Sequence, residues 1–284
     1  MIETMEALTW GKALKKAVTD YGLEESDARL LLEHAGALDR HRFRLIQNDP
    51  MPADTQAEYL KLLEKRLTHL PVQYIIGESC FCGLDFIVNE NVLIPRPETE
   101  QLAEAVFTSC DGKSVLDLCT GSGCIAVIVA KLGNPLSVTA CDISGKALDV
   151  ARKNAEKNGA NVKFWQGDLF EAVKDGKFDI IVSNPPYIAT KEIDTLMPDV
   201  RDFEPHLALD GAEDGLSFYR RIAKEAGKHL NKGGRLALEI GNDQGTSVPE
   251  LLEEAGFTDV SVKKDYSGND RMVFAVWEKL CLTN

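Results

Sequence analysis

Residues 115–126 read VLDLCTGSGCIA, a short apolar run that enters a glycine-rich turn and continues into a second apolar run. This order predicts a strand, a tight turn and the start of a helix. Glycine permits positive φ and places no Cβ in the way of a ligand, and a helix N-terminus offers backbone N–H groups without partners in the helix. The stretch therefore predicts a cofactor-binding loop at the carboxyl end of a strand.

The sequence on either side of this loop alternates short β-branched runs with stretches of helical periodicity. Such alternation predicts a seven-stranded, mostly parallel, doubly wound α/β sheet with helices on both faces. Only nine residues, 263–271, separate the last two runs, which is too few for a crossover helix, so we expect that pair to be antiparallel. The predicted strands are 114–118, 137–141, 162–166, 178–182, 235–240, 260–262 and 272–277.

The N-terminal part has a different texture. From residue 9 to about residue 70 the apolar positions recur at helical spacing, which predicts a small helical domain. Between Phe81 and Ile94 the pattern changes to alternation around Asn89-Glu90-Asn91, which suggests a β-hairpin that turns at these three residues. We therefore expect a helical domain over residues 1–78, a hairpin linker over 79–96 and a cofactor-binding domain over 97–284.

Composition narrows the classes of function. The 284 residues are 44% hydrophobic and 27% charged, which is ordinary for a globular protein, and the formal net charge of -13 does not favour binding to a phosphate backbone. No apolar run approaches the roughly 20 residues that cross a bilayer, and Met1 to Thr4 lack the layout of a signal peptide. Seven scattered cysteines without a CxxC pair predict reduced thiols and no metal site. We expect a cytoplasmic protein that acts on a protein or a small molecule.

The identity of the cofactor depends on three acids. Residues 121–126 also fit the G-x-G-x-x-A turn of dinucleotide-binding proteins, so the glycines alone do not decide. Asp117, Asp142 and Asp168 each lie near the carboxyl end of a predicted strand, where ligands of open α/β sheets bind. S-adenosylmethionine carries a ribose diol, an adenine amine and a free ammonium; we expect Asp142 to accept from the diol and Asp168 from the amine. A pyrophosphate finds no basic residue in the loop. The alternative is that these acids only cap turns.

The acceptor of the reaction is indicated by Ser183-Asn184-Pro185-Pro186-Tyr187, directly after the strand predicted over 178–182. Two prolines remove two backbone donors and stiffen the turn, so the Asn184 side chain and the Pro185 carbonyl are left as hydrogen-bond acceptors. A planar NH₂ group can donate to both while its lone pair faces a methyl donor, and Tyr187 can cover its flat face. The motif therefore predicts methyl transfer to an amide or amine nitrogen. On its own it also fits a rigid turn that ends a strand.

Together these segments resemble the release-factor glutamine N5-methyltransferases, which have the Rossmann-like fold of the class I methyltransferases. The resemblance runs over nearly the whole chain. It is carried by the cofactor loop, by Asn184 to Tyr187, and by PVQYIIG at 71–77, IPRPETE at 94–100 and EPHLAL at 204–209 ahead of Asp214-Gly215.

The resemblance implies that S-adenosylmethionine methylates the glutamine amide in the Gly-Gly-Gln motif of bacterial peptide chain release factors and leaves S-adenosylhomocysteine. It also implies that the helical domain helps to grip the release factor. By position, the expected cofactor contacts are Cys119, Thr120, Gly121, Ser122, Gly123, Asp142, Asp168, Leu169 and Asn184, to which the acids add Asp117. Asn184, Pro185, Pro186 and Tyr187 are expected to hold the glutamine, with Asn184, Pro185 and Tyr187 as the catalytic group. Cys119 departs from the family, which has glycine at this position, so a side chain is expected to narrow the pocket there.

Other functions remain open at this point. An adenine-N6 methyltransferase acting on DNA or RNA presents the same NH₂ geometry after base flipping. A nicotinamide-dependent oxidoreductase keeps the glycine loop but leaves the double proline unexplained, and a non-catalytic cofactor-binding module could dock through the helical domain. We also expect the long connection over 188–214 to close over the substrate.

Overall fold

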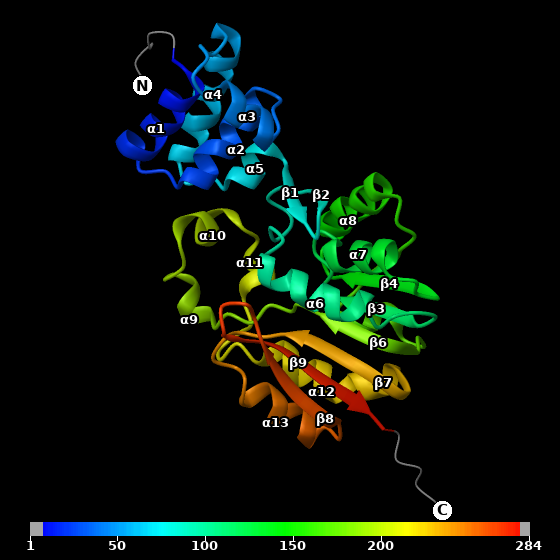
Figure 1. Ribbon diagram of the computed structural model, residues 1–284. Helices are drawn as coiled ribbons and strands as arrows, with labels where there is room; N and C mark the ends of the chain where they lie inside the picture. Colours follow the sequence, from blue (N-terminus) through cyan, green and yellow to red (C-terminus); the bar gives the residue numbers. More distant parts are fainter. Residues whose placement is uncertain (1–7, 279–284) are drawn as a thin grey trace, which may run out of the picture. The chain divides into compact units, whose positions relative to one another are not determined.

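The computed structural model describes residues 8–278, and the chain forms two compact units (Figure 1). The first unit contains the chain up to Gly77 together with Pro198–Phe203, and the second contains Glu78–Met197 and the chain from Glu204 onward. Met1 to Thr4 and Cys281 lie outside the described residues. Within residues 8–278, no helix has the length and apolar character needed to span a membrane.

The first unit is helical, as predicted. Its helices pack around buried Trp10, Tyr59 and the leucine pair Leu31 and Leu32. Arg66 binds Asp27 at 2.8 Å and also Asp199 at 3.2 Å, so this arginine joins the separate segment at 198–203 to the rest of the unit. The helices are α1 (Trp10–Tyr21), α2 (Glu25–Ala35), α3 (Arg40–Ile46), α4 (Ala53–Leu67), α5 (Val72–Ile76) and α10 (Pro198–Phe203).

The turn of the hairpin lies earlier in the sequence than predicted, at residues 82–83 and not at 89–91. Strands β1 (Glu78–Phe81) and β2 (Leu84–Ile87) pair antiparallel across a turn at Cys82 and Gly83, both of which have positive φ. Two such residues make the tight turn whose twist matches a hairpin. The prediction of a turn at 89–91 between strands is therefore wrong: Asn89 does form a turn, accepting from Asn91 and Val92, but this turn only ends the hairpin. The apolar alternation misled because Val92 and Ile94 are buried without belonging to a strand.

The second unit is built on the predicted seven-stranded sheet, in the order β5-β4-β3-β6-β7-β9-β8. Neighbours from β5 to β7 are parallel, and β9 pairs antiparallel with both β7 and β8, which confirms the prediction for the final pair. The strands are β3 (Ser114–Leu118), β4 (Ser137–Asp142), β5 (Lys163–Gln166), β6 (Phe178–Ser183), β7 (Leu230–Glu239), β8 (Thr258–Lys264) and β9 (Asp270–Trp277).

Helices cover both faces of this sheet (Figure 1). In β3, Val115 packs into one apolar core with α6 and α7, whereas Leu116 and Leu118 pack into the other core with α12 and α13. Burial on both faces explains why the strands read as continuous apolar runs. The remaining helices are α6 (Pro97–Phe107), α7 (Cys124–Leu132), α8 (Gly145–Asn158), the 3-10 helix η1 (Leu169–Val173), α9 (Thr190–Ile193), α11 (His206–Leu209), α12 (Ser217–His229) and α13 (Ser247–Glu254).

Asn154 of α8 ties the hairpin to the glycine loop. Its side chain is fully buried; Oδ1 accepts from the Ile87 backbone N–H at 2.6 Å, and Nδ2 donates to the Ile87 carbonyl at 3.0 Å and the Ser122 carbonyl at 2.8 Å. The Asn154 side chain therefore pairs with the backbone N–H and C=O of Ile87, the last residue of β2, as a neighbouring strand would. It also holds the backbone of the glycine loop at Ser122.

We expect Asn154→Ala to lower the free energy of unfolding by about 3 kcal/mol, because three buried backbone groups lose their partner. Asn158→Ala, one turn later on α8, removes a contact from a more exposed amide to the Asp85 carbonyl and should cost about 1 kcal/mol or less. Urea unfolding of both variants tests this. Equal losses for the two variants contradict the role given to Asn154.

Candidate active site

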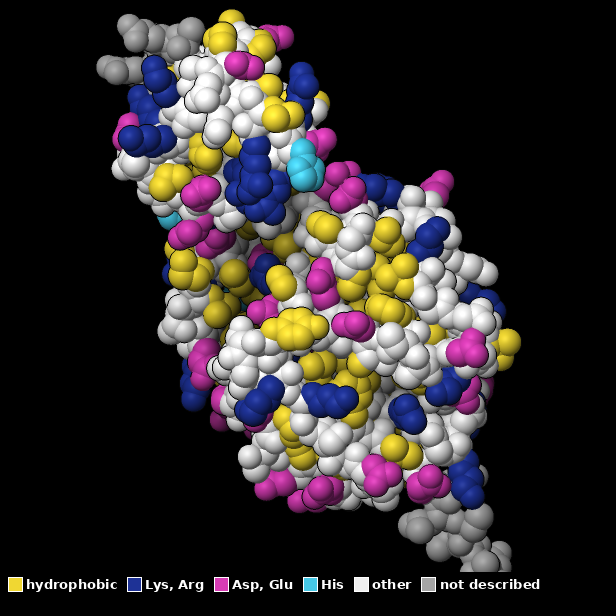
Figure 2. All heavy atoms as spheres, in the orientation of Figure 1, with side chains coloured by type: hydrophobic (Ala, Val, Ile, Leu, Met, Phe, Trp, Pro, Cys, Tyr) yellow, Lys and Arg dark blue, Asp and Glu magenta, His cyan; other side chains and the backbone are white. Residues whose placement is uncertain are grey.

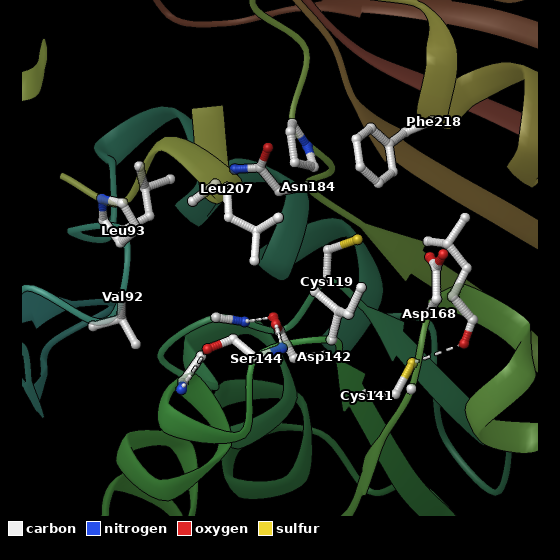
Figure 3. A pocket seen from close by; sticks show the side chains of 18 of the residues that line it. Val92, Leu93, Cys119, Cys141, Asp142, Ser144, Asp168, Asn184, Leu207 and Phe218 are labelled. Atoms are coloured by element: carbon white, nitrogen blue, oxygen red, sulfur yellow. Dashed lines mark hydrogen bonds between the residues drawn. The ribbon is translucent and has the colours of Figure 1, made fainter. Parts of the chain in front are cut away.

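A cavity opens at the carboxyl ends of β3, β4 and β6, where helices leave the sheet on opposite faces. This is the position at which open α/β sheets bind ligands. The space between its walls is about 880 Å³, including open solvent at the mouth. Figure 3 shows the interior. The lining residues are Asn91, Val92, Leu93, Cys119, Gly121, Cys141, Asp142, Ile143, Ser144, Ala147, Gly167, Asp168, Leu169, Asn184, Pro186, Pro205, Leu207, Ala208, Phe218 and Arg221.

The glycine loop turns through three residues with positive φ: Cys119 at 58°, Gly121 at 55° and Gly123 at 80°. Cys119 and Gly121 line the cavity. A Cβ on Gly121 would meet no atom within 4 Å, so the backbone conformation itself favours glycine there. A Cβ on Gly123 would come within 3.0 Å of the Ala151 Cβ, so this glycine also allows α7 and α8 to approach. Cys119 adopts the same left-handed region with a side chain that lines the cavity.

Asp117 supports the loop from inside the protein. It is fully buried and is absent from the cavity lining; its Oδ2 accepts from the Thr120 hydroxyl at 2.6 Å and the Ala126 N–H at 3.2 Å. Its Oδ1 has no hydrogen-bond partner among the described residues. Burial raises the pKa of Asp117 to about 7 despite these two donors. The geometry gives Asp117 a role in shaping the loop.

Asp142 joins the loop to the cavity wall. Its Oδ2 accepts from the Gly121 N–H and its Oδ1 from the Ser144 N–H, each at 2.9 Å. Burial raises the pKa of this carboxyl above its ordinary value, although backbone N–H donors oppose the shift. Each oxygen keeps a lone pair for a further donor, and the residue lines the cavity. A neighbouring diol could therefore be bound here.

Asp168 lies on another wall, beside η1. It forms an ion pair with Arg221 of α12 at 2.8 Å, and both residues line the cavity. Nothing in the sequence pattern pointed to this arginine. Leu169, with φ of 49°, turns the backbone so that it also lines the cavity. A donor such as an amine therefore meets a carboxylate that already has a positive partner.

The residues Asn184 to Tyr187, called the acceptor motif from here on, divide between the cavity and the protein interior. Asn184 and Pro186 line the cavity, and Figure 3 shows Asn184 in the same region as Cys119 and Phe218. Pro185 is buried and Tyr187 half-buried, and neither is among the lining residues. The Tyr187 hydroxyl donates instead to Glu239 Oε1 at 3.5 Å, while its carbonyl accepts from Gln244 at 3.1 Å. The turn is thus held from behind by buried polar groups.

The connection over 188–214 contributes part of the wall. An isolated bridge between Ile188 and Asp210 closes its base, and Pro205, Leu207 and Ala208 around α11 line the cavity. The buried Glu204 accepts from the Ile94 N–H at 3.2 Å and binds Arg96, which fastens this connection to the segment before α6. Closure over a substrate remains a prediction.

The structure brings together most, but not all, of the residues chosen from the sequence. Thr120, Ser122 and Gly123 join Asp117 in shaping the loop rather than lining the cavity. Sequence reasoning missed the residues at 91–93 and, on α12, Phe218 and Arg221. The segment at 204–209 carried a signal, since it was part of the family resemblance. The α12 residues carried none, because helical spacing alone does not show which face meets a ligand.

We expect Asp117→Asn to stabilise the protein increasingly as pH rises from 5 to 8. The pKa of Asp117 is raised in the folded state from 3.8 to about 7, so ionisation costs the wild type stability above pH 4 and the cost levels off above pH 7. A pKa difference of this size sets a ceiling of about 4 kcal/mol. Urea unfolding at the two pH values measures the effect.

Asp179→Asn supplies a control of opposite sign. Burial alone would raise the pKa of Asp179, but the Ser114 N–H and the side chains of Asn231 and Ser114 hold this pKa below its ordinary value. The wild type should therefore lose stability relative to this variant as pH falls. A pH-independent difference for Asp117→Asn contradicts the prediction.

Comparisons with known proteins agree on both units. Residues 6–77 match the family model described as the PrmC N-terminal domain, and residues 97–200 match the model described as the methyltransferase small domain. The chain is similar to the release factor glutamine methyltransferase of Geobacter sulfurreducens, with 41% identity over 94% of each chain. It is also similar to that of Bacillus subtilis, with 42% identity over 96% of this chain and 98% of the relative.

Among solved structures, the chain is similar to a methyltransferase from Pyrococcus furiosus, with a TM-score of 0.54 and 25% identity. The match covers 69% of this chain and 90% of the other.

Proposed function

Because the chain belongs to the release factor glutamine methyltransferase family, we propose that it methylates the glutamine of the Gly-Gly-Gln motif in bacterial peptide chain release factors. The methyl group comes from S-adenosylmethionine and goes to the side-chain amide nitrogen, N5. The observation that carries this proposal is the position of Asn184, which lines the same cavity as Cys119 and Gly121 of the glycine loop although the two segments are far apart in sequence.

The residues present fit S-adenosylmethionine. Asp142 has free lone pairs for the ribose diol, Asp168 can accept from the adenine amine, and the left-handed glycine at 121 leaves open space beside the loop backbone. Cys119, Leu169 and Asn184 complete the proposed contacts, with Thr120, Ser122, Gly123 and Asp117 holding the loop in shape. When bound, the cofactor supplies an electrophilic methyl group on a sulfonium.

The proposed acceptors for the substrate amide are the side-chain oxygen of Asn184, which lines the cavity, and the backbone carbonyl of Pro185, the buried residue that follows it. An amide nitrogen is a poor nucleophile because its lone pair is delocalised, so two acceptors that strengthen as positive charge develops lower the barrier. Held by both N–H groups, the nitrogen keeps its π face toward the methyl donor. Pro186 stiffens the turn, and we propose that Tyr187 covers the amide plane when substrate binds. No general base is required, because the proton leaves after methyl transfer.

We further propose that residues 1–78 dock the release factor, that 79–96 link the two parts and that 97–284 carry the chemistry in the cytoplasm. The cytoplasmic location is supported by the six cysteines of residues 8–278, which are all free thiols. On the face drawn in Figure 2, lysine and arginine are interspersed with aspartate and glutamate, which favours a protein over a nucleic acid as partner.

We expect the purified protein to transfer label from methyl-labelled S-adenosylmethionine to a bacterial release factor, and to lose this transfer when the glutamine of Gly-Gly-Gln is replaced by alanine. Duplex DNA and RNA are the matched alternatives in the same assay. Label in nucleic acid with none in the release factor would favour an adenine methyltransferase and refute the proposal.

We expect Asn184→Ala to lower kcat by at least a hundredfold while cofactor affinity falls only modestly, because the lost interaction acts on the reacting nitrogen. Asp142→Ala should do the reverse and act mainly on cofactor affinity, by about 2 kcal/mol for one charged hydrogen-bond partner. Calorimetric titration with S-adenosylhomocysteine and single-turnover kinetics separate the two effects. Wild-type turnover in Asn184→Ala excludes the acceptor role.

A further inference from the structure

A buried chain of hydrogen bonds lies behind Asn184. Asn184 Nδ2 donates to the Thr99 hydroxyl oxygen at 3.2 Å, and the Thr99 hydroxyl donates to Glu239 Oε2 at 2.6 Å. Thr99 lies in the first turn of α6 and Glu239 at the end of β7; their exposed fractions are 3% and 1%. The Tyr187 hydroxyl donates to the other oxygen of Glu239 at 3.5 Å. None of these groups except Asn184 lines the cavity.

The donor and acceptor groups available determine which way each hydrogen bond in this series runs. An ionised carboxylate can only accept, so the single proton of the Thr99 hydroxyl is committed to Glu239. The Thr99 oxygen can then only accept from Asn184, which requires the amide NH₂ of Asn184 to face Thr99. The carbonyl oxygen of Asn184 is consequently directed away from Thr99.

We propose that Glu239, acting through Thr99, is a positioning residue that sets the orientation of the Asn184 amide and keeps its oxygen available to the substrate. This inference rests on the proposed function, in which that oxygen accepts from the substrate glutamine. A rotation of the Asn184 amide by 180° exchanges nitrogen and oxygen with almost no change in shape. Packing cannot prevent this exchange, whereas the polarity of the hydrogen bonds can. In the exchanged orientation, NH₂ would face the NH₂ of the glutamine and no hydrogen bond could form.

Protonation of Glu239 would reverse the donor and acceptor roles in this series of hydrogen bonds. Burial raises the pKa of Glu239 to about 7, although the Thr99 hydrogen bond and the charge of Arg271 oppose this shift. A protonated Glu239 can donate to Thr99, whose own proton then points to Asn184 and favours its carbonyl oxygen. Turnover should therefore fall as pH drops below about 7. The titratable and charged groups facing Glu239 are Glu98 of α6, Cys124 of α7, Tyr187, Tyr219 of α12 and Arg271 of β9.

Three variants of the protein test the inference. Thr99→Val keeps the shape but removes the hydroxyl, Thr99→Ser restores the hydroxyl, and Glu239→Gln keeps the shape without a titrating group. Thr139→Val is the matched control, because Thr139 is also a buried threonine but lies in the middle of β4, outside the cavity lining. Release-factor methylation is measured from pH 5.5 to 9, together with binding of S-adenosylhomocysteine and urea unfolding.

We expect Thr99→Val to lower kcat at least tenfold with cofactor affinity within threefold of wild type, and Thr99→Ser to recover most of the turnover. The wild-type kcat should decrease below about pH 7, and this decrease should be absent in Glu239→Gln. Thr139→Val should lower kcat less than twofold.

Two outcomes overturn the inference while leaving the proposed function intact. One is a folded Thr99→Val with kcat within twofold of wild type. The other is a wild-type pH profile that Glu239→Gln reproduces, which also decides the matter if Thr99→Val does not fold. Failure of the wild type to methylate any release factor refutes the proposed function itself, so the two failures are distinguishable.

Discussion

The site depends on the parallel pairing of β3 with β4 on one side and β6 on the other. Because the three strands run in one direction, their carboxyl ends meet at one edge, and the segments that follow them are forced into a common space. The glycine loop follows β3, Asp142 ends β4 and the acceptor motif follows β6. Residues far apart in the chain thereby face one cavity.

This arrangement places several carboxyl groups in or near the protein interior, and they differ in burial and in the hydrogen-bond donors that surround them. Asp142 is held by two backbone N–H donors and remains at the cavity wall. Asp117 and Glu239 are almost completely buried, each with a pKa raised to about 7 by burial. Burial of an ionisable group lowers stability, but the hydrogen bonds that these two carboxyls accept hold the glycine loop and Tyr187 in place. In both cases a threonine hydroxyl within the site region is the donor, Thr120 for Asp117 and Thr99 for Glu239.

The same principle extends to the periphery of the cavity. Asn154 fixes the loop backbone from α8, and Glu204 fixes the segment ahead of α6 from the connection that contains α11. Each uses a buried polar side chain to satisfy backbone groups that no strand or helix satisfies. The walls of the cavity are thus held in place by side chains that do not themselves line it. Family membership indicates which reaction the protein catalyses, and these contacts show how the backbone around the cavity is held in this chain.

Periodicity, glycine and proline act on the local backbone, so the sheet, the helical first unit and the turns after β3 and β6 could all be predicted from the sequence. The sequence pattern misplaced the hairpin turn, since Val92 and Ile94 are buried by tertiary packing and not by strand pairing. Three relations became visible only in the folded chain: Asp117 shapes the loop from within, Arg221 pairs with Asp168, and Thr99 links Asn184 to Glu239. These relations join elements far apart in the chain. A hydrogen bond or ion pair needs its two atoms close together in space, and no local pattern encodes that proximity.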